Sequence, residues 1–204
     1  MMRKLILLFL FAPFFVSIAN SQSAWYGELL EHRKKRDEEL RMEEKSPIPT
    51  DYKEQFNGLR YFEPDNSYHV TAEFIRIKKP KPVWFATSDG KEKEYMRFAQ
   101  IKFVLLGKQY TLAAYYSEKI RAQEGMSKHI FVPFKDLTNL IETYGGGRYL
   151  DLTEPEDNVL QVDFNRAYNP YCAYSDGYSC PKVPNENYLE VKIPVGEKNL
   201  YTEK

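Results

Sequence analysis

The stretch QIKFVLLGKQYTLAAYY, residues 100–116, decides the fold class of this chain. In its first half Ile101, Phe103 and Leu105 alternate with side chains of the opposite face, which is the period-two pattern of a β-strand. Gly107 follows where a tight turn joins two strands, and the chain then continues through residues 109–116. We therefore predict an antiparallel β-hairpin at this point.

The same signals recur on both sides of this hairpin. Residues 88–91 read Ser-Asp-Gly-Lys, an Asp-Gly turn that joins two further strands. Short strands connected by tight turns predict a mainly β protein, either an antiparallel β-sandwich or a partly open barrel, with one N-terminal α-helix. Residues 117–128 form a polar connection that has room for a helical turn. The other strand candidates are residues 68–74, 83–87, 130–134, 159–164 and 189–193.

Composition supports this fold class and excludes one function. The chain has 204 residues, which is the size of one domain, and its 16 Tyr and 13 Phe favour half-buried pleated surfaces. Lys and Arg together number 29, as do Asp and Glu, so the net charge is zero. A nucleic-acid-binding protein normally has a basic excess, so we expect no nucleic-acid partner.

The first 21 residues have the layout of a secretory signal peptide. Arg3 and Lys4 precede an apolar run over residues 5–18, and small residues allow cleavage after Ala19 or Ser21. The run is shorter than the roughly 20 residues that span a bilayer. We therefore predict a periplasmic or secreted protein with no stable membrane insertion after cleavage.

Residues 24–45 are predicted to form a charged helix. Opposite charges recur at a spacing of four residues, and Trp25, Leu29 and Leu40 form a thin apolar stripe with the stems of Arg33 and Arg36. Such a helix packs one edge on a domain and exposes the rest to water. The predicted organisation is a signal peptide over residues 1–21, this helix with a Pro-rich linker over 22–49, and one β-rich domain over 50–204.

The chain has only two cysteines, Cys172 and Cys180. In an oxidising compartment they favour a disulfide, which would stabilise the fold by about 2–3 kcal/mol through loop closure. Two thiols do not make a zinc site, which needs four ligands. We expect neither a metal nor a cofactor.

Three consecutive glycines, Gly145, Gly146 and Gly147, precede Arg148. Exposed N–H groups of such a run can form a backbone nest for an anion, and Arg148 can grip a carboxylate or phosphate with two prongs. The alternative is a tight connection in which Arg148 pairs with an internal acid. The sequence leaves both interpretations open.

Residues 163–169 combine polar groups with aromatic walls, as a small-molecule pocket requires. If a strand continues from Asp163, that side chain shares a face with Asn165. The alternative is a long ordered loop whose amides bind backbone groups. The residues predicted to bind a ligand here and at the glycine run are Arg148, Tyr149, Asp163, Asn165, Tyr168, Asn169 and Glu186.

Enzyme motifs are mostly missing from the sequence. It has no Gly-x-Ser-x-Gly elbow and no His-Glu-x-x-His, and its three histidines have no ligand spacing. The leading hypothesis is an exported protein that binds a small polar or anionic ligand. The alternatives are a hydrolase-type enzyme that uses Asp163 or Glu186 with Arg148, and a structural protein that docks through its charged helix.

Several distinctive motifs are spread along the chain, at residues 87–90, 131–138, 144–151, 163–172, 179–187 and 196–197, with Arg33 and Asp37. Together they resemble a bacterial family called domain of unknown function 1684. The resemblance covers nearly the whole mature chain and implies a β-rich domain without an assigned activity. It also implies that the cysteine pattern occurs in members that are not exported, where both cysteines would be buried small hydrophobes.

Overall fold

The structure of the protein is a computed structural model that describes residues 14–42 and 46–200, with side chains from residue 22 onward. Most of the predicted signal peptide therefore lies outside the described residues, and its side chains are not described. Among the described helices, none is both long enough and apolar enough to cross a membrane.

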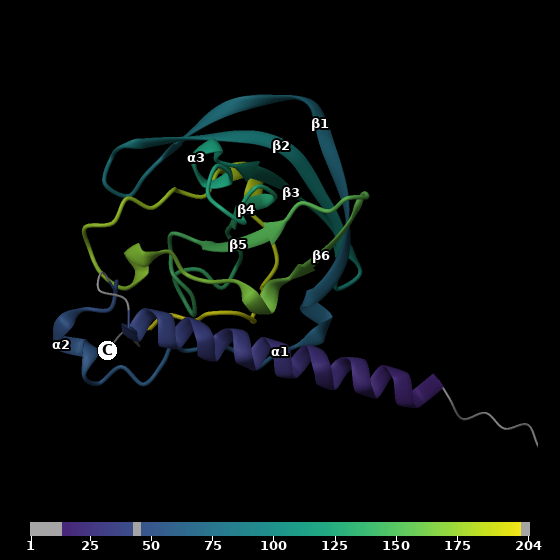
Figure 1. The fold of residues 1–204 in the computed structure, drawn as a ribbon, viewed down its shortest axis with the longest axis horizontal. Coiled ribbons are helices and arrows are strands. Elements are labelled where there is room, and N and C mark those ends of the chain that lie inside the picture. The colour runs from purple at the N-terminus through teal and green to yellow at the C-terminus, as the bar shows by residue number, and fades with distance from the viewer. Residues whose placement is uncertain (1–13, 43–45, 201–204) are drawn as a thin grey trace, which may run out of the picture.

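Six antiparallel strands form one sheet that is nearly closed into a barrel, which confirms the predicted fold class (Figure 1). The strand order is β5-β4-β3-β2-β1-β6, so the five consecutive strands β1 to β5 pair as neighbours and β6 returns to the edge beside β1. The strands are β1 His69–Ala86, β2 Glu92–Leu105, β3 Lys108–Tyr116, β4 His129–Phe134, β5 Arg148–Thr153 and β6 Val159–Asp163.

The hairpin predicted from residues 100–116 is confirmed as the pairing of β2 with β3, in which Phe103 lies opposite Tyr110. Leu106 and Gly107 connect the strands with positive φ angles of 49° and 78°. Two positive φ angles are what a type I′ turn needs, and its twist matches that of the strands. Ile101 and other residues of the same face of β2 point into the barrel and are buried.

The strands predicted at residues 68–74 and 83–87 are parts of one long strand, β1. Its pairing with β2 shifts register between Arg76 and Lys81, where four residues oppose one. Pro80 and Pro82 lie at this bulge, and a proline has no N–H to donate to a sheet ladder. The bulge allows β1 and β2 to curve together over the barrel (Figure 1).

The strand predicted at residues 189–193 is wrong, although Leu189 and Ile193 are buried in the barrel core. The backbone turns here, because the N–H of Val191 bonds to the carbonyl of Leu189. Leu189 and Val191 still form backbone hydrogen bonds with residues 135 and 137, whereas the carbonyl of Ile193 accepts from the Arg148 side chain. Period-two apolarity therefore reports burial of this segment, whose backbone pairing is interrupted by the turn.

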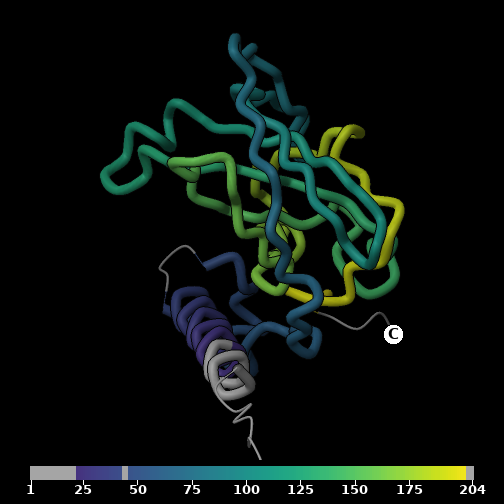
Figure 2. The backbone as a smooth tube through the Cα atoms, turned by 90° about the vertical axis from the view of Figure 1, so that its right-hand side faces the viewer, coloured from purple at the N-terminus to yellow at the C-terminus, as the bar shows by residue number. Residues whose placement is uncertain are grey.

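The charged helix α1, Phe14–Met42, lies against the barrel as a separate layer (Figures 1 and 2). The predicted apolar stripe is confirmed, because Leu29, Leu40 and Arg33 are buried. The indole N–H of Trp25 donates to Asp163 over 2.9 Å and fixes the helix to the end of β6. The remaining helical turns are α2 Thr50–Lys53, α3 Glu118–Arg121, η1 Asn66–Tyr68, η2 Phe164–Arg166, η3 Tyr171–Ala173 and η4 Asn185–Asn187.

The two faces of the sheet bury different side chains. The inner face and the C-terminal segment form an extended core of aliphatic residues and phenylalanines. The other face carries a smaller aromatic cluster, whose buried members are Phe85, Tyr95, Ala113, Tyr115, Phe131 and Tyr149. Because α1 does not cover this second cluster completely, it forms part of a cleft.

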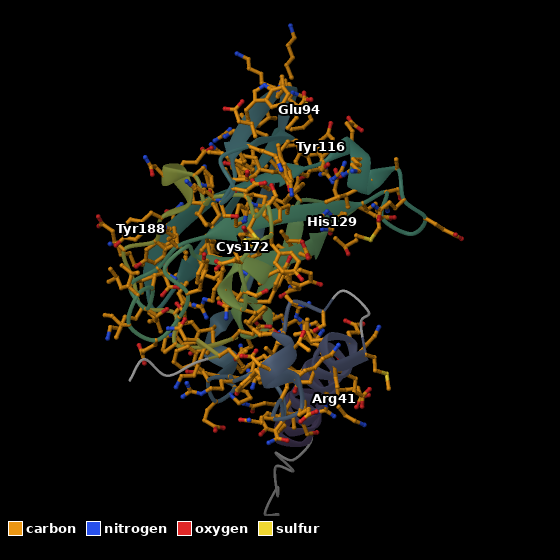
Figure 3. All side chains as sticks on the ribbon, turned by 90° about the vertical axis from the view of Figure 1, so that its left-hand side faces the viewer. Arg41, Glu94, Tyr116, His129, Cys172 and Tyr188 are labelled. Carbon is orange, nitrogen blue, oxygen red and sulfur yellow. A yellow bond between two sulfur atoms is a disulfide. The ribbon has the colours of Figure 1, made fainter. Side chains whose placement is uncertain are left out.

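The predicted disulfide between Cys172 and Cys180 is confirmed. It closes a loop that packs beside the turn between β1 and β2, where the Ser88 hydroxyl donates to the carbonyl of Tyr178 over 2.7 Å. The backbone N–H of Cys180 in turn donates to the Ser88 hydroxyl over 3.0 Å. The disulfide loop is thereby fixed to the sheet from which the aromatic cluster projects (Cys172 is labelled in Figure 3).

Candidate functional site: an aromatic cleft beside the N-terminal helix

A cleft of about 780 Å³ lies between α1, the outer face of β4 and β5, the segment after η2 and the disulfide loop. Figure 2 shows that the chain around α3 projects from the barrel on the same side as α1. Residues of that projection, including Gln123 and Met126, also line the cleft. Parts of the chain that are far apart in the sequence therefore meet around one cavity of the size that small-molecule sites have.

Strand alternation decides which side chains of β4 and β5 face the cleft. Phe131 lies opposite Asp151 in the antiparallel pair, and His129 and Tyr149 lie two residues from them on the same face. All four line the cleft. The residues between them, such as Ile130, point into the barrel core. The β4–β5 pair thus packs into the barrel core with one face and lines the cleft with the other.

Aromatic rings form much of the cleft surface. The Phe131 ring stacks on Tyr95 at 5.2 Å between centroids and meets the edge of Tyr149 at 4.8 Å. Tyr168 meets Tyr149 edge-on at 5.8 Å, and the two backbones pair as a β-bridge. Burial raises the pKa of Tyr95 to about 12 and that of Tyr168 well above its usual value, so both hydroxyls stay protonated at neutral pH. Neutral rings in this arrangement suit a planar apolar group.

The helix α1 contributes the charged wall of the cleft. His32, Arg36 and Glu39 follow one another at helical spacing and all line it. The Arg36 guanidinium lies over the Tyr168 ring at 4.9 Å, and its Nε donates to Glu197 over 3.3 Å. Burial alone would lower the pKa of Arg36, but the carboxylate of Glu197 and nearby tyrosines raise it, so this cation is permanent.

One terminal nitrogen of Arg36 stands out from the other polar groups of the cleft. Its Nη2 is buried and has no hydrogen-bond partner among the described residues. A buried guanidinium nitrogen without an acceptor costs free energy, so it favours any ligand that supplies one. The pKa of His32 is lowered, first by burial and then by the charges of Arg166 and Arg36, so near neutral pH His32 does not compete for an anion as a second cation.

Three of the residues predicted from sequence line this cleft, namely Tyr149, Asn165 and Tyr168. The Tyr149 hydroxyl donates to the carbonyl of Pro181 in the disulfide loop. Asn165 is buried and binds the backbone of Asp65 in both directions, over 2.9 Å each. The amide thus has a structural task, and the two tyrosines supply the wall that the sequence predicted.

Arg148 lies in the protein interior with an exposed fraction of 0%. Its Nη2 donates to Asp136 over 2.7 Å and to the Ile193 carbonyl over 2.8 Å, and its Nη1 donates to the Val195 carbonyl. Of the two interpretations that the sequence left open, the structure therefore shows the one in which Arg148 pairs with an internal acid. Its terminal nitrogens are occupied by the protein itself, so Arg148 does not serve as a clamp in the cleft.

The glycine run is likewise filled by protein atoms. A Cβ at Gly146 would meet the Tyr144 ring at 2.2 Å, and one at Gly147 would meet the carbonyl oxygen of Phe134 at 2.7 Å. Gly147 also has a positive φ of 96° and its N–H bonds to the Tyr144 carbonyl. The three glycines therefore permit close packing, and the N–H of Gly147 is already engaged, although Gly146 lines a small separate pocket of about 310 Å³.

The remaining predicted site residues hold segments together. Asp163 accepts hydrogen bonds from the Trp25 indole and from Asn165, and Asn169 donates to the carbonyl of Lys198 over 2.9 Å. Glu186 accepts from both nitrogens of the Arg97 fork and from the Tyr115 hydroxyl, away from the cleft lining. The structure does not gather Asp163, Glu186 and Arg148 around one cavity.

Sequence reasoning missed the residues that bring charge to the cleft. Arg36 belongs to a helix face that the sequence assigned to packing and solvent, and His129 resembled an ordinary strand end. A signal was present, because His129 with Phe131 and Tyr149 with Asp151 repeat at a spacing of two in neighbouring strands. Among the described residues, no group of three or more His, Cys, Asp and Glu side chains is placed to hold a metal ion.

The fold and the cleft define a class: a mainly β protein with an antiparallel sheet nearly closed into a barrel, covered on one side by a long N-terminal helix. The chain belongs to the family described as "Protein of unknown function (DUF1684)", whose model matches residues 54–198. This confirms the resemblance seen in the sequence. The matched range begins after α1, so Arg36 and the other helix residues of the cleft lie outside it.

A solved structure supports the assignment. The chain is 36% identical to an uncharacterized protein of Haloarcula marismortui, known from a solution NMR structure, with a TM-score of 0.70. The comparison covers 88% of this chain and 96% of that one. No curated protein matches the chain.

Proposed function

We propose that this protein binds a small organic anion with a planar body in the cleft between α1 and the β4–β5 face. The observation that carries the proposal is Arg36, a permanent cation whose guanidinium lies over the Tyr168 ring at 4.9 Å and whose buried Nη2 has no partner among the described residues. A carboxylate beside Arg36 would supply the missing acceptor in a charge-assisted hydrogen bond.

The walls of the cleft favour a planar group attached to this carboxylate. Tyr95, Phe131, Tyr149 and Tyr168 are linked by successive ring contacts along one side. Aromatic pairs gain free energy when rings stack or meet edge-on, so an aromatic ligand fits this side better than an aliphatic one of equal volume. The proposed site lies beside Arg36 and not, as the sequence predicted, beside Arg148, but the proposed ligand is still a small anion.

Thermal unfolding of the purified protein with three probes tests this proposal. Benzoate carries both features, benzamide lacks the charge, and cyclohexanecarboxylate lacks the aromatic ring. At about 100 times its dissociation constant benzoate would add about 2.7 kcal/mol of stability. We expect it to raise the melting temperature by about 5–10 °C and the other two probes to raise it less.

A paired substitution locates the effect. Arg36→Gln with Glu197→Gln removes the cation without leaving its carboxylate unpaired, and Asn169 and Tyr174 still have an acceptor in the new amide. The matched control is Lys34→Gln with Glu38→Gln, an exposed pair on the same helix. We expect only the first pair to abolish the benzoate shift. No shift in the wild type, or a shift that survives the first pair, would refute the proposal.

We also propose that the protein works outside the cytoplasm. Arg3, Lys4 and the apolar run after them support export, and the Cys172–Cys180 disulfide is compatible with it. Expression in a bacterium, followed by fractionation and N-terminal sequencing, tests this. We expect periplasmic or medium fractions whose first residue is Asn20 or Gln22, and an uncleaved cytoplasmic product would refute export.

A further inference from the structure

A hydrogen-bonded chain of side chains runs along one wall of the cleft. The Tyr168 hydroxyl donates to Oδ2 of Asp151 over 2.6 Å, and Oδ1 of the same carboxylate lies 2.8 Å from Nε2 of His129. At the other end the Tyr168 ring carries the Arg36 guanidinium. Arg36 and His129 therefore stand at opposite ends of a wall built on Tyr168 and Asp151.

When the His129 ring is neutral, Asp151 determines which of its two nitrogens carries the hydrogen. An ionised carboxylate only accepts hydrogen bonds, so Nε2 of His129 must be the donor. In the neutral imidazole the other nitrogen, Nδ1, is then left with a lone pair and acts as an acceptor. The second oxygen of Asp151 is held by Tyr168, which keeps the carboxylate oriented toward the ring.

Nδ1 of His129 has no hydrogen-bond partner among the described residues. The His129 side chain is 8% exposed and lines the cleft, and Figure 3 shows it at the edge of the barrel that faces α1. A buried acceptor without a donor is costly, so most such groups in native proteins have a partner. Asp151 fixes the orientation of the ring through Nε2, but within the described chain no donor reaches Nδ1.

We propose that the ligand itself supplies this partner, by donating a hydrogen bond to Nδ1 of His129. The ligand class is then an aromatic carboxylate that carries a hydroxyl or amino group at the end away from its carboxylate. The carboxylate lies by Arg36, the ring lies along Tyr168, and the donor reaches His129 once the side chains that shield Nδ1 shift. This inference rests on the proposed function, since it assigns the second end of the same site.

Calorimetric titration with 4-hydroxybenzoate and 4-methoxybenzoate tests the inference. The two probes share the carboxylate and the ring, and only the first has a hydrogen to donate. One hydrogen bond contributes about 0.5–1.5 kcal/mol, so we expect the hydroxyl compound to bind about three- to tenfold more tightly. His129→Leu removes the acceptor and should reduce this ratio to about one, whereas His69→Leu, outside the cleft lining, should keep it.

Asp151→Asn provides a second readout, because Asp151 is a positioning residue. The amide of Asn can donate to Nε2, which moves the ring hydrogen to Nδ1 and turns the acceptor into a donor. We expect the preference for 4-hydroxybenzoate to be lost and the ¹⁵N shifts of His129 to report the other tautomer. Equal binding of both probes by the wild type, or a preference that survives His129→Leu, would overturn the inference.

The two proposals fail differently. If neither 4-hydroxybenzoate nor benzoate binds, the proposed function fails and the inference falls with it. If both bind through Arg36 with equal affinity, the anion site stands and only the assignment of His129 is wrong.

Discussion

Two arginines, Arg148 at 0% exposure and Arg36 at 18%, distinguish the scaffold of this molecule from its candidate site. Arg148 in the barrel interior has both terminal nitrogens engaged, by Asp136 and by backbone carbonyls of the C-terminal segment. Arg36 at the cleft has one carboxylate partner, an aromatic ring beneath it and Nη2 without an acceptor among the described residues. The comparison teaches that burial and an acidic partner alone do not mark a ligand site. Each arginine has one buried donor without a partner among the described residues, Nε of Arg148 and Nη2 of Arg36, and what separates the two is that only Arg36 lines the cleft.

The comparison predicts the largest loss of stability for Arg148→Met. This change leaves Asp136 as a buried charge without its cation and removes the donor of the Ile193 carbonyl. We expect the free energy of unfolding to fall by about 3–5 kcal/mol, the cost of breaking a buried ion pair. Urea unfolding measures it, and a loss under about 1 kcal/mol would contradict the scaffold role.

The disulfide loop contributes both to the stability of the scaffold and to the lining of the cleft. Replacing Cys172 and Cys180 by Ser should lower the free energy of unfolding by about 2–3 kcal/mol, since an open loop gains entropy on unfolding. Because Cys180 and Pro181 line the cleft, the benzoate shift should also weaken. Wild-type protein under reducing conditions serves as the control and should behave like the variant.

Arg36→Gln alone should cost less than Arg148→Met, about 1–2 kcal/mol. Glu197 and Asp136 each keep two donors when their arginine is replaced. The costs differ because the Arg36 side chain is 18% exposed, whereas Arg148 is fully buried and also donates to backbone carbonyls. The same urea experiment ranks the two arginines, and the order would be reversed if Arg36 were the main support of the fold. In contrast, the loss of benzoate binding should be complete for Arg36→Gln and absent for any Arg148 variant that still folds.

The smallest effect is expected at Glu186, a half-exposed ion pair. The two-pronged hydrogen bond from Arg97 is the main reason why the pKa of Glu186 lies below its usual 4.5. A carboxylate whose pKa is lowered on folding stabilises the fold above that usual pKa, and this contribution disappears as the pH falls below it. With a side-chain exposure of 42%, Glu186→Gln should cost less than about 1 kcal/mol at pH 7. The difference between variant and wild type in urea midpoint should vanish under acid conditions.

Much of the barrel could be predicted from local pattern. Alternation in residues 100–116 and the Asp-Gly turn at residues 88–91 fix hairpins whose partners are close in sequence. Local pattern failed for two segments, one wrongly predicted as a strand and one strand that was missed. Residues 189–193 alternate like a strand, although a turn between Leu189 and Val191 interrupts the segment and the Arg148 side chain binds its last carbonyl. The strand β5 begins directly after three glycines, which weaken any strand signal.

The site was predictable only in part, for a physical reason. Tyr149 and Tyr168 carry their own signal, since aromatic residues beside polar ones suggest a wall wherever the chain places them. Arg36 and His129 become site residues through contacts with Glu197 and Asp151, and nothing local in the sequence links the members of these pairs. The same is true of Asn169, whose partners lie in the C-terminal segment.

The contact between Arg36 and Glu197 joins residues 161 positions apart. A ribosome releases the first of them, and then all six strands of the sheet, before the second. The hairpins of the sheet are therefore synthesised before this contact can form. Under the proposed function, the charged wall of the cleft is completed only after the whole sheet has left the ribosome.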